Sequence, residues 1–381
     1  MKKLFILMVL LSAPIFAQCD WNGDMSIDVL DVVSIADCIV NQCWDGSQCD
    51  WNGDGSINII DIVVLLECIL DECVVFGCMT SYANNFNPEA MIDNGSCEYF
   101  EWVTVLAGEF TYGWENCNGE EWCGETFGEE VRSIDYDFEI MKYEVTNTQY
   151  IAFLQEAWDS GILSIGGCSD WYQGESCIHG YYEGDEYFSA GDYVYYLLDP
   201  DYWDPDIVKI QFDGEEFTIL DSFSDHPVSF VTWFGAVAFS KRYNKRLPTD
   251  EEWEKTARGL TGYEYPCGES YGDDMSDKAN YMYSGDPWDN ATTPVGYYNG
   301  NNETIDCQSP YGAYDLAGNV GEWTITLIPS QGYLSEWENS TRGGGWSDNS
   351  YIIQSWFHYN WPPMYGFKQV GFRLTRDLAQ E

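Results

Sequence analysis

Positive charge is scarce in this sequence. Of its 381 residues, 16 are Lys or Arg and 64 are Asp or Glu, so the formal net charge is −48. No basic residue occurs between Lys3 and Arg132. A surface of this charge repels phosphate backbones and anionic lipid headgroups, which excludes nucleic acid and acidic membranes as partners. Divalent cations are the natural counterions, so ordered carboxylates are candidate metal ligands.

Long apolar runs are also missing, except at the N-terminus. The chain starts Met1-Lys2-Lys3 and is then apolar as far as Ala17. This pattern is typical of a secretory signal peptide and is too short to span a bilayer. We expect residues 1–17 to be removed and the protein to be secreted, extracellular or at the cell surface, without membrane insertion. A lipid anchor on Cys19 is the alternative, although Gln18 is too large for that processing signal.

Histidine is rare, with three residues, whereas cysteine is plentiful, with 14. An even number of cysteines in an exported chain predicts disulfides, although spacing alone does not fix their connectivity. The pairs that we expect are Cys78–Cys97, Cys117–Cys123, Cys168–Cys177 and Cys267–Cys307.

Two copies of one cysteine-framed unit occupy residues 18–75. The run that starts at Cys19, Cys-Asp-Trp-Asn-Gly-Asp, returns at Cys49. Oxygen ligands fall at loop positions 1, 3, 5, 7, 9 and 12, the spacing with which a tight loop surrounds Ca²⁺. The two predicted ligand sets are Asp20, Asn22, Asp24, Ser26, Asp28 and Asp31, and Asp50, Asn52, Asp54, Ser56, Asn58 and Asp61.

The two loops differ at the sixth position, which usually requires Gly for a positive φ. Gly55 occupies it in the second loop and Met25 in the first. We therefore expect the second loop to bind calcium more tightly. Apolar residues such as Val32 and Ile62 follow each loop and predict a helix with a buried face.

These units resemble type I dockerin repeats. The resemblance implies a small α-helical module that calcium folds and that docks onto a cohesin partner. Dockerins carry a polar pair at loop positions 10 and 11, where this chain has Val29-Leu30 and Ile59-Ile60. A calcium-stiffened spacer or an intramolecular docking unit is the alternative to cohesin docking. Residues 76–100 form a further small unit, bounded by Cys78, for which we expect a linker role.

From residue 101 onwards aromatic and basic residues return, and Gly and turn residues separate short segments. Helices are expected at residues 147–157, 233–243 and 251–258, the last with Thr249 and Glu252 as a capping box. The remainder predicts short strands and long ordered loops, so the fold class is α+β. The stretch 160–222 is an acidic insert rich in tyrosine.

Seven ordered motifs carry a second resemblance. They lie at residues 102–113, 142–150, 226–228, 246–255, 318–323, 342–346 and 371–374. Residues 101–377 resemble the formylglycine-generating enzyme (sulfatase-modifying factor) family. The resemblance implies a C-type-lectin-like fold with little regular secondary structure.

Oxidising members of that family hold Cu(I) on two cysteines, five residues apart, after a Gly-Gly motif, and convert a substrate cysteine to formylglycine. Soft thiolates suit Cu(I) and oxygen ligands do not replace them. In this chain Asp348 and Ile353 occupy the two cysteine positions, and no cysteine follows Cys307. We therefore expect no copper and a non-catalytic binding or structural module. The alternative is a formylglycine-generating oxidoreductase that acts on sulfatase cysteines.

The resemblance also implies two structural calcium sites in the large domain. One would use Asp315, Gly318, Val320 and Glu322. The other would use Asn280, Tyr281, Asp286 and Trp288, with Asp289 as an alternative to Asp286.

Aromatic residues crowd the segment 347–370, which corresponds to the exposed surface of variable proteins with this fold. Rigid aromatic rings suit sugar rings or protein hot spots, and we expect about half of them to lie in the core. The candidate surface for an unknown extracellular glycan or protein comprises Trp356, His358, Tyr359, Trp361 and Tyr365.

Overall fold

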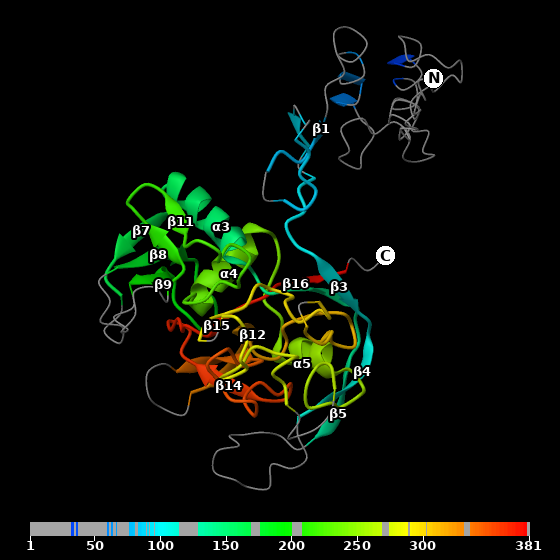
Figure 1. Ribbon diagram of the computed structural model, residues 1–381. Coiled ribbons are helices and arrows are strands. Elements are labelled where there is room, and N and C mark those ends of the chain that lie inside the picture. Colours follow the sequence, from blue (N-terminus) through cyan, green and yellow to red (C-terminus); the bar gives the residue numbers. More distant parts are fainter. Residues whose placement is uncertain are drawn as a thin grey trace, which may run out of the picture. The chain divides into compact units, whose positions relative to one another are not determined.

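The computed structural model divides into two compact units, residues Met1–Phe100 and Glu101–Glu381 (Figure 1). It describes residues 101–378 except 114–128, 169–175, 200–207, 269–273, 289, 302 and 331–335. In the first unit it describes most of residues 76–100 and single helical positions between 32 and 66. The signal peptide and all the predicted ligands of the two repeat loops lie outside the described residues.

The described positions after the repeat loops are helical. Val32 and Ile62 belong to these helices, as predicted for the segments that follow the loops. Val32 is buried, whereas Ile59 and Ile60 are exposed. The predicted buried face therefore does not include Ile59 and Ile60.

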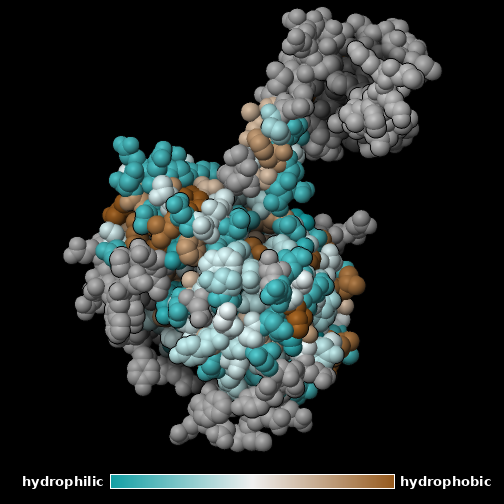
Figure 2. All heavy atoms as spheres, in the orientation of Figure 1, coloured by the Kyte–Doolittle hydropathy of each residue, from teal (hydrophilic) through white to brown (hydrophobic). Residues whose placement is uncertain are grey.

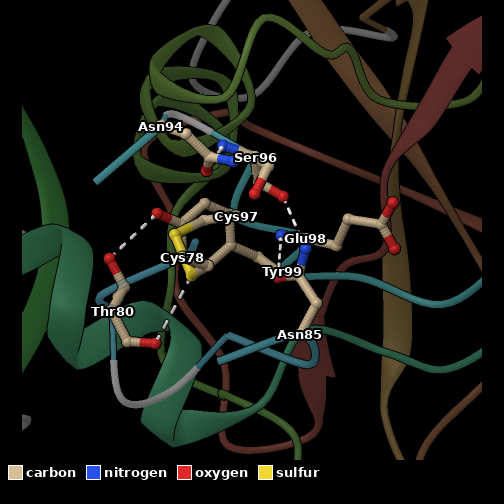
Figure 3. Close-up of a disulfide and its surroundings, with 8 residues drawn as sticks. All are labelled: Cys78, Thr80, Asn85, Asn94, Ser96, Cys97, Glu98 and Tyr99. Carbon is tan, nitrogen blue, oxygen red and sulfur yellow. Dashed lines mark hydrogen bonds between the residues drawn. A yellow bond between two sulfur atoms is a disulfide. The ribbon is translucent and has the colours of Figure 1, made fainter. Parts of the chain in front are cut away.

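Residues 76–100 form a small unit held by the Cys78–Cys97 disulfide, which confirms that predicted pair. Strand β1 (Phe76–Gly77) pairs in parallel with β2 (Ile92–Asp93). The Asn85 amide donates to the Ser96 carbonyl at 2.6 Å, and the Glu98 N–H donates to Asn85 Oδ1 at 2.8 Å (Figure 3). The amide side chain thus joins two loop segments beside the disulfide.

The large unit begins with a sheet that joins its two ends. Strands β3 (Trp102–Val105), β6 (Phe138–Met141) and β16 (Thr375–Asp377) form an antiparallel sheet in the order β16-β6-β3. Strands β4 (Gly108–Tyr112) and β5 (Glu130–Ile134) form a hairpin between the first two. Phe110, Ile134 and Phe138 pack in one buried apolar cluster, so the hairpin and the sheet share a core.

A second sheet carries the C-terminal motifs. Its strands are β12 (Gly321–Pro329), β13 (Trp337–Arg342), β14 (His358–Trp361) and β15 (Val370–Gly371), in the order β14-β13-β12-β15. The β12–β15 pair is parallel and the other pairs are antiparallel. The segment between β13 and β14 holds Asp348 and Ile353.

The insert adds strands of its own. These are β7 (Leu163–Gly166), β8 (Ser176–Tyr182) and β9 (Gly191–Asp199) in one antiparallel sheet, and β10 (Ile210–Phe212) and β11 (Phe217–Ile219) in a hairpin. The predicted Cys168–Cys177 disulfide is present. Strands β7–β9 lie beside α3 and α4, on the far side of the large unit from the β4–β5 hairpin (Figure 1).

The three predicted helices are confirmed. They are α3 (Asn147–Asp159), α4 (Trp233–Arg242) and α5 (Asp250–Arg258). At the start of α5, Glu252 N–H donates to Thr249 Oγ1 at 3.1 Å and Thr249 N–H donates to Glu252 Oε2 at 2.8 Å. This reciprocal pair satisfies two backbone donors that a helix start leaves open.

Short strands and ordered loops make up most of the rest, so the α+β class and the low content of regular structure are confirmed for the large unit. Within the described residues, no helix has the length and apolar character needed to cross a membrane.

A buried cluster of charges joins α5 to β13. The Arg342 Nε–H donates to Asp250 Oδ1 at 2.7 Å, and its Nη2 contacts Asp250 Oδ2 and, at 2.8 Å, Glu254 Oε2. Arg258 donates to the other oxygen of Glu254 at 2.8 Å. The side chains of Arg342, Glu254 and Arg258 are fully buried. Each charge therefore depends on its partners, because water does not reach it.

Replacing Arg342 with Met leaves Asp250 and Glu254 without their shared cation. We expect Arg342→Met to lower the free energy of unfolding by about 3–5 kcal/mol, the usual effect of breaking a buried pair. The matched control is Arg242→Met, because the Arg242–Glu156 pair is about half exposed and should contribute less than about 1 kcal/mol. Urea unfolding of both variants measures the difference; equal losses would contradict the prediction.

Candidate functional site

Asp348 and Ile353, the two positions where the resemblance implies copper cysteines, lie in the loop between β13 and β14. Asp348 Oδ2 accepts a hydrogen bond from the Gly345 N–H at 2.9 Å, and the Asp348 carbonyl accepts one from the Met282 N–H at 2.8 Å. Burial raises the pKa of the Asp348 carboxyl. Ile353 is fully buried in an apolar cluster with Met275 and Tyr298. One position is thus a loop-bracing carboxyl and the other a core residue.

Cysteines elsewhere do not supply a thiol pair in the part of the chain that the structure describes. Cys267 and Cys307 form the predicted disulfide, and the other described cysteines are paired as Cys78–Cys97 and Cys168–Cys177. The predicted Cys117–Cys123 pair lies outside the described residues. A disulfide sulfur is not a thiolate, so these cysteines are unsuited to Cu(I).

The loop reaches this position through tight glycine turns. Gly343 and Gly344 have φ values of 86° and 60°, a region that side chains rarely adopt. At Gly345 a Cβ atom would lie 2.6 Å from the Gln369 carbonyl oxygen. A side chain at Gly345 would therefore displace the neighbouring segment.

Aromatic rings form a continuous row along the segment after the loop. Successive ring pairs include Tyr351–Phe357, Phe357–Tyr359, Tyr359–Trp361 and Trp361–Phe367. Of the predicted ligand surface, Trp356 is 2% exposed and Tyr365 9% exposed. His358, Tyr359 and Trp361, all on β14, are half-buried. The structure therefore places two of the five predicted residues in the core and three at partly accessible positions.

His358 lies beside the buried charge cluster of Arg342 and Asp250. Burial and the neighbouring Arg342 guanidinium lower the pKa of His358 from 6.5 to about 4, although the Asp250 carboxylate opposes the shift. The buried Nδ1 atom of His358 has no hydrogen-bond partner. The imidazole is therefore neutral at physiological pH.

The predicted calcium ligand Glu322 lies in a buried ion pair. Its carboxylate accepts two hydrogen bonds from Arg373, both at 2.7 Å, and one from Trp253 Nε1 at 2.8 Å. Glu322 Oε1 accepts only one of these three bonds, and a carboxylate oxygen accepts about two. A metal ion would therefore share Glu322 with Arg373.

Asp315 is a second buried carboxyl of this region, and Glu144 is a third that the sequence did not single out. Asp315 Oδ2 accepts the Gly296 N–H at 2.5 Å, and Glu144 Oε1 accepts the Val320 N–H at 3.1 Å. Burial raises the pKa of Asp315 to about 6. Burial also raises the pKa of Glu144, and the negative charges of Asp315 and Glu322 raise it further. Three carboxyls thus surround one guanidinium, that of Arg373.

Asn319 connects the two predicted calcium sets. Its amide donates to Glu144 Oε2 at 2.8 Å, and its Oδ1 accepts the Thr293 N–H at 2.9 Å. The backbone of Asn280 pairs with that of Gly318, and the Asn280 carbonyl accepts the Asn319 N–H at 2.8 Å. A Cβ atom on Gly318 would lie 2.1 Å from the Asn280 carbonyl oxygen, so only Gly permits this approach.

The other ligands of the second set lie in the loop after Asn280. Asp286 accepts from Ser284 Oγ at 2.6 Å and from the Trp288 N–H at 2.7 Å. The Tyr281 carbonyl accepts the Ser284 N–H, and the Trp288 carbonyl accepts the Ala291 N–H. Asp289, the alternative to Asp286, lies outside the described residues.

These oxygen atoms have the chemistry that Ca²⁺ prefers, since it binds carboxylates and backbone carbonyls. Among the described residues, no three His, Cys, Asp or Glu side chains are grouped as metal ligands. An ion at either predicted site would therefore depend on the carbonyls of Gly318 and Val320, or of Tyr281 and Trp288, in addition to the carboxylates.

A match over the whole large domain shows the family of this chain. The sequence profile of the sulfatase-modifying factor enzyme 1-like domain matches residues 89–378. The chain belongs to this family. The resemblance found in the ordered motifs is thus confirmed for the large unit, whereas the dockerin resemblance of the first unit stays a prediction.

The relatives of this domain include proteins named as a kinase, as an inactive enzyme and as a formylglycine-generating enzyme. Serine/threonine-protein kinase pkn1 of Chlamydia caviae is 41% identical over 116 residues, which cover 30% of this chain and 16% of the kinase. Inactive C-alpha-formylglycine-generating enzyme 2 of Bos taurus is 35% identical over 137 residues, covering 33% and 40%. Formylglycine-generating enzyme of Mus musculus is 34% identical over 120 residues, covering 29% and 30%. The chain thus spans less than half the length of these relatives.

Solved structures similar to this member of the family include PvdO from Pseudomonas aeruginosa, with a TM-score of 0.49 and 21% identity, covering 74% of this chain and 95% of that one. Another is Treponema denticola variable protein 1, with a TM-score of 0.42 and 17% identity, covering 73% and 95%.

The pKa of His358 makes stability depend on pH. Between about pH 4 and 6.5 the unfolded chain binds more protons at this residue than the folded chain does, so stability falls as pH falls through that window. Between pH 7 and pH 5 we expect the free energy of unfolding to fall by about 2 kcal/mol more in the native protein than in His358→Gln. One pKa unit corresponds to about 1.4 kcal/mol. Urea unfolding at both pH values measures this difference. The same pH dependence in both proteins would contradict the account of His358.

Proposed function

We propose that this protein is an exported, calcium-stabilised member of the family whose large domain binds a ligand and does not catalyse formylglycine formation. The observation that carries the proposal is the pair Asp348 and Ile353. One braces a loop through the Gly345 N–H, and the other fills the apolar core. Neither side chain offers the soft sulfur that Cu(I) requires.

The names of the relatives are compatible with a non-catalytic role but do not decide it. One relative is named an inactive C-alpha-formylglycine-generating enzyme and another a formylglycine-generating enzyme. Their identities to this chain, 35% and 34%, are nearly equal. The residues at positions 348 and 353 therefore support the proposal more directly than overall similarity does.

Export and calcium binding complete the proposal. The apolar N-terminus that ends at Ala17 and the disulfides support export. The repeat loops of residues 20–31 and 50–61 have calcium-ligand spacing. In the large domain, Glu144, Asp315 and Glu322 place three buried carboxyls around the single cation Arg373. A divalent cation at Asp315, Gly318, Val320 and Glu322 would offset this excess of negative charge. For the first unit, docking onto a cohesin-like partner and a calcium-stiffened spacer are the alternative roles.

Activity is tested with a peptide that carries the sulfatase motif Cys-x-Pro-x-Arg. The protein is incubated with this peptide, Cu(I), a reductant and O₂, and the peptide mass is followed. We expect no formylglycine, whereas an active family enzyme in parallel should convert the peptide. Copper-dependent conversion by this protein would overturn the proposal in favour of the oxidoreductase alternative.

Calcium is tested by thermal unfolding with and without chelator. Because an ion that binds only the folded state stabilises it, we expect EDTA to lower the Tm of the full chain by several degrees. Asp315→Asn should reduce the part of this shift that comes from the large domain, whereas Asp135→Asn, at an exposed position, should keep the native shift. An unchanged Tm in EDTA would count against every calcium site proposed here.

A further inference from the structure

We propose that a tyrosine-walled pocket between the insert and helices α3 and α4 binds a neutral sugar residue of a glycan. The pocket has a volume of about 450 Å³, within the range of small-ligand sites. Asp348 and Ile353 do not line it. The inference rests on the binding role proposed above and names the site and the chemical class of the ligand.

Three tyrosines from the insert form one wall of this pocket: Tyr181 and Tyr182 on β8, and Tyr195 on β9. The Tyr195 hydroxyl donates to the Tyr181 carbonyl at 2.8 Å, and the Tyr182 hydroxyl donates to Asp185 at 2.5 Å. Gly180 leaves space for the Tyr195 ring, because a Cβ atom there would lie 2.2 Å from it. Two rings are thus fixed before a ligand arrives, which lowers the entropic cost of binding.

The floor and the outer edge of the pocket are apolar. Phe153 and Leu163 are buried and line the floor, together with Val237 of α4. At the edge, Tyr181 is 58% exposed and Ile162 is 62% exposed. Figure 2 shows hydrophobic residues gathered on the surface where α3 and β7 lie in Figure 1. A planar apolar face, such as that of a pyranose ring, can pack against an exposed tyrosine ring at this edge.

Charged groups around the same pocket provide hydrogen-bond donors and acceptors. Arg242 and Glu156 form an ion pair at 2.6 Å. Lys241 Nζ lies 5.0 Å from the centroid of the Tyr182 ring. Glu183 is exposed at the end of β8. Ammonium and carboxylate groups beside an aromatic wall can donate to and accept from the hydroxyls of one sugar ring.

The charge balance favours a neutral ligand. Two cations, Lys241 and Arg242, and two carboxylates, Glu156 and Glu183, line the pocket, so its formal charge is zero. The chain as a whole carries −48, which disfavours the approach of acidic sugars. A neutral hexose or pentose residue avoids this repulsion and matches the zero formal charge of the lining.

The test is calorimetric titration of the full chain with neutral oligosaccharides, namely cellohexaose, xylohexaose and mannohexaose, and with acidic oligogalacturonate. We expect at least one neutral oligosaccharide to bind and oligogalacturonate not to bind. Tyr181→Ala should weaken binding at least tenfold. Ala238→Phe, which fills the pocket from α4, should abolish it. Tyr187→Ala is the matched control, because Tyr187 is a 40% exposed tyrosine of the same insert that does not line the pocket.

The inference would be overturned by no binding of any neutral oligosaccharide, by binding of oligogalacturonate instead, or by affinity unchanged in both Tyr181→Ala and Ala238→Phe. Loss of binding in Trp361→Ala but not in Tyr181→Ala would move the sugar site to β14 and would also overturn it. Peptide turnover with copper tests the non-catalytic role separately, so the pocket can fail while the proposed function stands.

Discussion

The buried guanidinium of Arg342 is the contact on which the C-terminal half of the domain depends. It binds Asp250 and Glu254 of α5, and its Nη1 donates to the carbonyls of Ser355 and Trp356 at 3.3 and 3.0 Å. One side chain on β13 therefore fixes a helix and the end of the loop that leads to β14. All these groups are removed from water, so each needs its ion-pair or hydrogen-bond partner to offset the cost of burial. These paired contacts therefore fix the position of the loop.

That constraint holds the loop without cysteines at positions 348 and 353. Arg342 and the glycine turns at Gly343 and Gly344 hold the start of the loop, and the Asp348 carboxyl braces it through the Gly345 N–H. An isoleucine at position 353 joins the apolar cluster of Met275 and Tyr298, where its burial contributes of the order of 1.5–3 kcal/mol. The position that would hold a reactive thiolate serves stability here.

Local signals in the sequence were sufficient for the helices and the family, and the three predicted disulfides within the described residues are confirmed. The capping box of Thr249 and Glu252 is a short-range feature that a sequence displays directly, whereas Cys267–Cys307 is one of several pairings that the cysteine spacing allows. Glu144 was missed because its role depends on Asn319 and Arg373, which lie far away along the chain. Trp356 and Tyr365 were assigned to a surface and are buried, since composition does not tell which rings of an aromatic-rich segment face the core. The pocket was missed for a similar reason, because it forms only where an insert meets two helices.

We propose that packing around Asp348 and Ile353 leaves no room for copper at this position. The most direct test is to titrate Cu(I), supplied as a coloured chelator complex, against the non-reduced protein and to follow the chelator absorbance. We expect the chelator to keep its copper at every protein concentration. Transfer of one Cu(I) per chain would contradict it.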